Sequence, residues 1–199
     1  MPNPRLYGFR YLCPETGSNY QRPMPLRVAS GYAVALNVGD PVELTAAGDV
    51  ILSPAGSVVL SMMGVIVGIG PYWDGTKMTV GNRLPANTTP GAANIERESI
   101  VYVMPAAHNL FECCTSTAPG TRAACITLVG MNLDHVNTAV PPLNWPELNI
   151  ASALNTTAQW RVVDLPRSTV DVDWAALYVP LIVSGNEIAT PPATPLVGI

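Results

Sequence analysis

The stretch that decides the fold class is residues 32–69, YAVALNVGDPVELTAAGDVILSPAGSVVLSMMGVIVGI. Short apolar runs in it are separated by turn residues, such as Gly39-Asp40-Pro41 and Ala47-Gly48-Asp49, which suit tight connections between strands. The continuous run at residues 58–69 contains valine, isoleucine and glycine rather than strong helix formers. It predicts a central strand buried on both faces, in which the glycines relieve crowding. Three further strands are expected at residues 32–36, 42–45 and 50–52, the last two forming a hairpin.

The same pattern of short apolar runs continues toward the C-terminus. An Asp-Gly turn predicts a hairpin leading into residues 77–80, and the polar residues 81–98 predict a long surface loop. Residues 140–146 are broken by prolines and predict a crossover, and one short helix is expected at residues 152–157. Because no amphipathic helices of about 10–15 residues separate the strands, a parallel α/β fold is excluded. The sequence therefore predicts an all-β fold, a β-sandwich or barrel of jelly-roll type with little helix, whose later strands are expected at residues 99–104, 110–115, 123–130, 159–165 and 174–183.

The composition restricts the class of protein. The chain has 199 residues, of which 12% are charged and 48% hydrophobic, with 20 Pro, 16 Gly and a single lysine, Lys77. A soluble domain carries roughly 25% charged residues, so this chain has about half the usual charge. It is too apolar for a disordered segment, and it has too many prolines and too few lysines for a helical bundle. A β domain with so little charge indicates a surface that neighbouring proteins cover.

The distribution of proline divides the chain into three parts. Residues 1–27 combine an alternating aromatic run with prolines and predict an extended N-terminal arm. Residues 28–188 are expected to form a single β domain, and the proline-rich residues 189–199 a polyproline-like or disordered tail. The first residues include prolines and arginines where a secretion signal would be apolar. The longest apolar run, residues 58–69, is shorter than the roughly 20 residues of a membrane span, so no membrane partner is expected.

The N-terminal arm is the candidate binding segment. Its four arginines face a single acid, Glu15, whereas the net charge of the chain is −4 at pH 7. The overall negative charge disfavours nucleic acid as a partner. The local positive charge predicts either an ordinary solvated surface with a chance asymmetry or docking on an acidic protein. The aromatic residues of the arm are expected to be anchors while its backbone adds a strand to a neighbour's sheet; alternatively, they pack on their own domain. The candidate partner-binding residues are Arg5, Tyr7, Phe9, Arg10, Tyr11, Arg22 and Arg27.

The residues that could carry chemistry form no recognisable catalytic motif. Four cysteines in a chain this long, two of them adjacent, do not make a disulfide framework and are expected to be reduced, buried thiols. With His108 and His135 they could suggest zinc, but the spacing H-x4-C-C-x10-C matches no common zinc site. Asp171 and Asp173 would share one face of a strand, where paired carboxylates can do acid–base work or bind calcium, and more often prevent strand edges from pairing. The sequence predicts no metal, no cofactor and no catalytic residue.

Three parts of the sequence resemble structural proteins of tailed bacteriophages. The first is PNPRLYGFRYL at residues 2–12. The second is NVGDPVELTAAGDVILSPAG at residues 37–56, followed by a strand that ends in GVIVGI at residues 64–69. The third is AQWRVVDLP at residues 158–166, with the aromatic-containing DWAALYVPLIV at residues 173–183.

This resemblance implies a head-decoration (cement) protein, which binds the outside of a phage capsid and stabilises it. Its partners would be the major capsid protein and further copies of itself, in a dimer or trimer. Its location would be the head surface of the virion, after synthesis in the host cytoplasm. No catalytic residue comes with the family, so the chain is not expected to be an enzyme. The alternative is a tail, neck or host-attachment module of the same virion, in which loops such as residues 81–98 bind glycan.

Overall fold

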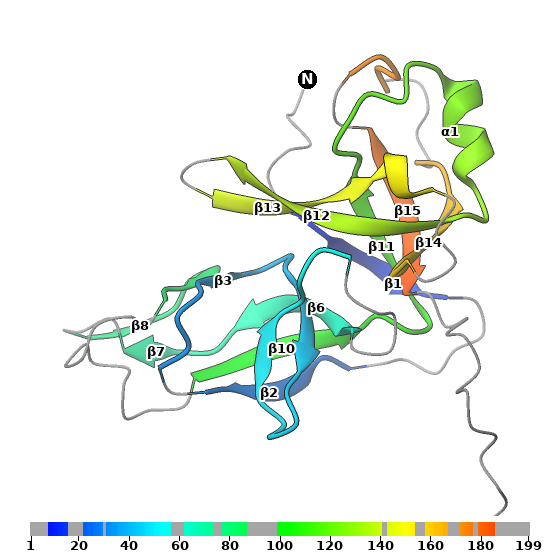
Figure 1. The fold of residues 1–199 in the computed structure, drawn as a ribbon. Coiled ribbons are helices and arrows are strands. Elements are labelled where there is room, and N and C mark those ends of the chain that lie inside the picture. Colours follow the sequence, from blue (N-terminus) through cyan, green and yellow to red (C-terminus); the bar gives the residue numbers. More distant parts are fainter. Residues whose placement is uncertain are drawn as a thin grey trace, which may run out of the picture.

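Two antiparallel sheets dominate the computed structural model of the chain, one six-stranded and one five-stranded (Figure 1). They are accompanied by two small two-stranded sheets and one short α-helix among the described residues. The all-β prediction is therefore confirmed, although neither large sheet closes into a barrel with its described strands. The structure describes residues 8–15, 22–29, 31–56, 62–73, 77–86, 99–140, 143–153, 158–166, 172–176 and 179–185.

The six-stranded sheet contains both the first and the last described strand and packs around one core. Its strands in spatial order are β1 (Arg10–Pro14), β11 (Asn109–Cys114), β15 (Pro180–Gly185), β14 (Trp160–Asp164), β12 (Asn132–Val140) and β13 (Leu143–Asn149). The largest fully buried side chain, Trp160, stacks on Phe9 and meets Phe111 edge-on. Val65 and Met104, from the other sheet, join the same core, so this cluster holds the two sheets together.

The five-stranded sheet is built around the hairpin and the central strand that the sequence predicted. Its order is β2 (Met24–Val28), β10 (Ser99–Pro105), β6 (Met62–Ile69), β4 (Pro41–Leu44) and β5 (Val50–Leu52). Strands β4 and β5 form the expected hairpin, and β6 lies between β10 and β4 as expected. Glycine is required within β6, because a Cβ on Gly64 would overlap the carbonyl oxygen of Met104.

The small sheets correct two boundaries. Strand β3 (Leu36–Asn37) pairs with β9 (Arg83–Leu84), and β7 (Tyr72–Trp73) pairs with β8 (Met78–Thr79) in the predicted hairpin. The strand expected at residues 32–36 is wrong except for Leu36, because Tyr32 instead uses its hydroxyl to accept a hydrogen bond from Leu52 N–H at 2.8 Å. The loop expected at residues 81–98 contains β9; its residues 87–98 lie outside the described residues.

The strand expected at residues 123–130 is wrong, because helix α1 (Arg122–Leu128) occupies this segment. Thr121 caps the helix, its Oγ1 accepting a hydrogen bond from the Ala124 N–H at 3.2 Å. Two alanines follow the cap and favour a helix, and Gly130 beyond the helix has φ +87°, a left-handed conformation suited to glycine. The apolar run of the sequence therefore belongs to a helix that lies on the side of the six-stranded sheet remote from the five-stranded one (Figure 1).

The crossover expected at residues 140–146 is also wrong. Strands β12 and β13 form a long antiparallel hairpin, with Val140 paired to Leu143 and Asn137 paired to Pro146. Strand β13 is the edge of its sheet, where a proline that lacks an N–H is tolerated.

The last expected elements are only partly correct. The strand expected at residues 174–183 begins later, as β15, and a turn precedes it. The expected short helix is a 3-10 turn, η3 (Ile150–Ser152), that starts two residues early, and residues 154–157 lie outside the described residues. The expected tail at residues 189–199 lies outside them as well.

The extended N-terminal arm is corrected for its described part. Residues 10–14 form β1 and pair with β11 in the six-stranded sheet. Residues 24–28 form β2 and pair with β10 in the five-stranded sheet. This pairing satisfies the backbone groups on one side of each strand, and it buries Val28 and partly buries Tyr11 and Leu26 within the chain itself. The boundary expected at residue 27 therefore falls inside a strand.

Candidate interaction surface

Phe9 is not available to a partner, so its prediction as an anchor is wrong. Its side chain is 2% exposed and stacks on Trp160 with ring centroids 4.0 Å apart. It also meets the ring of His135 edge-on, and its N–H donates a 3.0 Å hydrogen bond to the carbonyl of Gly39. Phe9 thus bridges the six-stranded sheet and the loop before β4, which is the alternative that the sequence left open.

The neighbours of Phe9 on β1 also interact with their own sheet. Tyr11 is half-buried and meets Phe111 edge-on at 5.8 Å between ring centroids. Arg10 is exposed and forms an ion pair with Glu112, the residue directly opposite on β11. Arg5 and Tyr7 lie outside the described residues. Arg10 and Tyr11 therefore stabilise the pairing of β1 with β11, while the Arg10 side chain stays exposed and Tyr11 stays half-buried.

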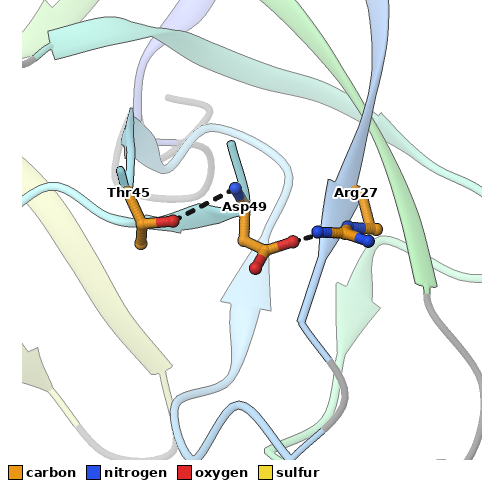
Figure 2. A network of polar contacts seen from close by, with 3 residues as sticks. All are labelled: Arg27, Thr45 and Asp49. Atoms are coloured by element: carbon orange, nitrogen blue, oxygen red, sulfur yellow. Dashed lines mark hydrogen bonds and ion pairs between the residues drawn. The ribbon is translucent and has the colours of Figure 1, made fainter. Parts of the chain in front are cut away.

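The two remaining arginines lie at the exposed strand β2. Arg22 is exposed just before the strand. Arg27 lies within it and donates from Nε to the Asp49 carboxylate at 2.6 Å (Figure 2). Asp49 is held in turn by its own N–H, which donates to Thr45 Oγ1 at 3.1 Å in the β4–β5 turn. This contact connects the two edges of the five-stranded sheet, so the sheet is curled.

An exposed apolar surface lies beside Arg27 on the same sheet face. Tyr102 is directly opposite Pro25, and Ile100 is directly opposite Arg27, so the four side chains point to one side. All four are exposed, Ile100 by 47% and Tyr102 by 41%. We call these four residues the β2–β10 face.

Glycines border the β2–β10 face on β6 and beyond it. On the other side of β10, Tyr102 is paired with Gly68, and the Gly70 N–H donates to the carbonyl of Ile100 at 2.8 Å. Neither glycine carries a side chain that would cover its neighbour on β10. Two positions along from Tyr102, Met104 on the same face is buried by the core of the six-stranded sheet. This sheet face is therefore buried at Met104 and exposed at Tyr102 and Ile100.

Ile100 and Tyr102 were not among the binding residues predicted from the sequence, although the sequence carries a signal for them. Residues 99–104, SIVYVM, are apolar on both faces of a strand, since Val101 and Val103 alternate with Ile100 and Tyr102. A strand that is apolar on both faces needs other residues, or a partner protein, packed against each face. Val101 and Val103 on one face are fully buried, whereas on the other face Met104 is buried and Ile100 and Tyr102 are exposed.

The cysteines and histidines do not form a chemical centre in the described part of the chain. No group of three or more His, Cys, Asp or Glu side chains is placed there to hold a metal ion. All four cysteines are free, and Cys113 and Cys125 are buried as expected, whereas Cys13 and Cys114 are half-buried. Burial raises the pKa of the Cys113 thiol, and it raises the pKa of Cys114 to about 12, which makes both thiols poor nucleophiles.

The expected pair of acids on one strand is not found. Asp173 precedes β15 in a turn, where its carboxylate accepts the Ala175 N–H at 3.1 Å. Asp171 lies outside the described residues. Asp173 is therefore a turn residue rather than half of a strand pair.

Comparison with known proteins gives no relative for this chain. No protein-family model matches it, and neither a curated protein nor a solved structure does. Within the described ranges, no helix is both long and apolar enough to span a membrane.

Proposed function

We propose that this chain is a non-enzymatic virion structural protein that binds the outside of a phage capsid and stabilises it. The support from the sequence is the resemblance of residues 2–12, 37–56 and 158–166 to tailed-phage structural proteins. The support from the structure is the β2–β10 face, an exposed patch of Ile100 and Tyr102 beside a basic strand. The β2–β10 face thus replaces Phe9 as the proposed site of contact.

The chemistry of the β2–β10 face suits a protein partner. Tyrosine and arginine are enriched in the residues that dominate binding energy, and the centres of interfaces are depleted in charge. The face offers Tyr102 and Ile100 as apolar contacts, with Arg27 and Arg22 on its basic side. The Arg27 guanidinium is already held by the Asp49 carboxylate. Binding to an acidic residue of a partner would therefore cost less conformational entropy than ordering a mobile arginine side chain. The proposed partner surface is an acidic-rimmed apolar patch on the major capsid protein.

Binding of this kind stabilises a shell by mass action. A protein that binds the assembled capsid and not its dissociated subunits shifts the equilibrium toward the assembled state. The contributions of the many copies bound to one particle add, so a modest stabilisation from each copy is sufficient. We propose that the protein occupies the head surface in this way, as a dimer or trimer, with the major capsid protein as its partner.

The test compares two isoleucines with equal exposure. Ile100 in the β2–β10 face and Ile126 on α1 are each 47% exposed. Ile100→Asp and Tyr102→Asp should each weaken cosedimentation with capsids that lack this protein by about tenfold or more, the effect of about 1.4 kcal/mol. Ile126→Asp should bind like the wild type. Thermal unfolding of each variant establishes that the fold is retained.

Two outcomes would contradict the proposal. If the wild-type chain does not bind capsids in any stoichiometric amount, the function is wrong. If it binds and the Ile100 and Ile126 variants are weakened equally, the function stands and the β2–β10 face is not the contact. Deletion of residues 1–24 would be a poor test, because it removes Phe9 from the core.

A further inference from the structure

A buried polar cluster joins the two large sheets. His135 on β12 is fully buried, and its Nε2 donates to the carbonyl of Ser53 at 3.1 Å. Ser53 directly follows β5. Gln159, just before β14 and also fully buried, donates from Nε2 to Ser53 Oγ at 3.1 Å. His135 in the six-stranded sheet and Gln159 beside it thus both bind Ser53, which directly follows the five-stranded sheet, next to the ring of Phe9. We call His135, Gln159 and Ser53 the joint.

The joint is built for a neutral histidine. With Nε2–H donating to a carbonyl, Nδ1 carries the lone pair, and among the described residues Nδ1 is buried without a hydrogen-bond partner. A second proton would go to Nδ1 and make a fully buried imidazolium that takes part in neither of the ion pairs found in the described part of the chain. A buried charge without an ion-pair partner costs several kcal/mol in general, so protonation destabilises the closed joint.

The groups that face His135 do not offset this cost. Phe9 is neutral, whereas the hydrogen bonds that Ser53 and Gln159 make with the ring favour its charged form, as do the carboxylates of Asp134 on β12 and Glu43 on β4. Burial outweighs all four contributions and lowers the pKa of His135 below its usual 6.5. Neither carboxylate forms one of the ion pairs found in the described part of the chain.

We propose that the joint is an acid-sensitive switch, in which uptake of one proton by His135 releases Ser53 and separates the five-stranded sheet from the six-stranded sheet. The direction follows from linkage. Because the open chain binds a proton at His135 more readily than the closed one, the contribution of the joint to stability is present above about pH 6.5. It is lost as the pH falls below that value. The proposal does not depend on the partner of the β2–β10 face.

The chain provides its own matched control, because its two histidines differ in burial. His135 is fully buried and His108 is exposed. The wild type should lose its near-UV circular dichroism and its buried Trp160 fluorescence between about pH 6.5 and about pH 4, with most far-UV signal retained. His135→Gln, which keeps a donor for the Ser53 carbonyl, should move this transition at least about one pH unit lower. His108→Gln should leave it in place.

Three results would overturn the switch. The first is that the wild type keeps its near-UV signal down to about pH 4. The second is that His135→Gln loses this signal at the same pH as the wild type, and the third is that His108→Gln shifts the transition by as much as His135→Gln does. If His135→Gln does not fold at neutral pH, the wild type is followed by proton NMR. The buried imidazole must then take up its proton in the same pH range in which the tertiary signal is lost, and a proton uptake that precedes this loss without affecting it contradicts the proposal.

Discussion

Replacement of Phe9 by alanine distinguishes a core residue from a binding residue. Phe9 is 2% exposed, stacks on Trp160 and lies against His135, so the substitution removes a large ring from the contact between the two sheets. Truncation of a buried phenylalanine costs about 3–5 kcal/mol, from lost transfer free energy and the cavity left behind. In a protein of this length 1 kcal/mol lowers Tm by about 2–4 °C, so Tm should fall by about 6–20 °C.

The assay is thermal unfolding of the purified chain, followed by near-UV circular dichroism and calorimetry. Tyr102→Ala is the control, because this aromatic residue is 41% exposed and its truncation should change Tm by only a few degrees. If Phe9 were an anchor for a neighbour, Phe9→Ala would leave Tm unchanged and reduce only binding. A loss of Tm below about 2 °C would falsify the assignment of Phe9 to the core.

Three further predictions address other parts of the molecule. Gly64→Ala should destabilise the protein by about 2 kcal/mol or more in urea unfolding, because the added Cβ would overlap the Met104 carbonyl oxygen. Gly48→Ala is the comparison and should cost less, because the space around its Cβ is open and only its φ of +83° is unfavourable. Burial raises the pKa of Asp40 to about 7 from its ordinary 3.8, so ionisation of this carboxyl lowers the stability of the wild type as the pH rises through this range. The stability of Asp40→Asn relative to the wild type should therefore be about 2 kcal/mol greater at pH 8 than at pH 5, and an equal difference at both pH values would contradict this. Iodoacetamide at pH 8 should leave Cys113 and Cys114 largely unmodified in the native protein, since few of these thiols are ionised, and mass spectrometry after urea unfolding should show both alkylated.

The local features of the five-stranded sheet could be predicted from the sequence. The Ala47-Gly48-Asp49 turn between two apolar runs specifies the β4–β5 hairpin, and Gly48 has the φ of +83° that such a turn requires. The run of valine, isoleucine and glycine specifies β6 as a central strand. These features depend on neighbours within a few residues, and that information is present in the sequence itself.

The sequence could not show where its aromatic and proline-rich segments go. Phe9 and Tyr11 alternate with polar residues in the same way whether they enter a neighbour's sheet or their own, because alternation gives the spacing of a strand and not its partner. Pro146 suggested a break, yet an edge strand tolerates it. The alanines before Cys125 became a helix because the Thr121 cap acts with them.

Local sequence patterns are enough to specify an all-β chain of low charge, with a hairpin and a buried central strand. Which apolar side chains remain exposed and which polar groups are buried depends on the folded arrangement of the whole chain. Ile100 and Val101 are adjacent apolar residues on one strand, but one is 47% exposed and the other fully buried. His135 and His108 differ in the same way. The physical reason is that burial depends on what the rest of the chain places over each side chain, which is a property of distant residues brought together by folding.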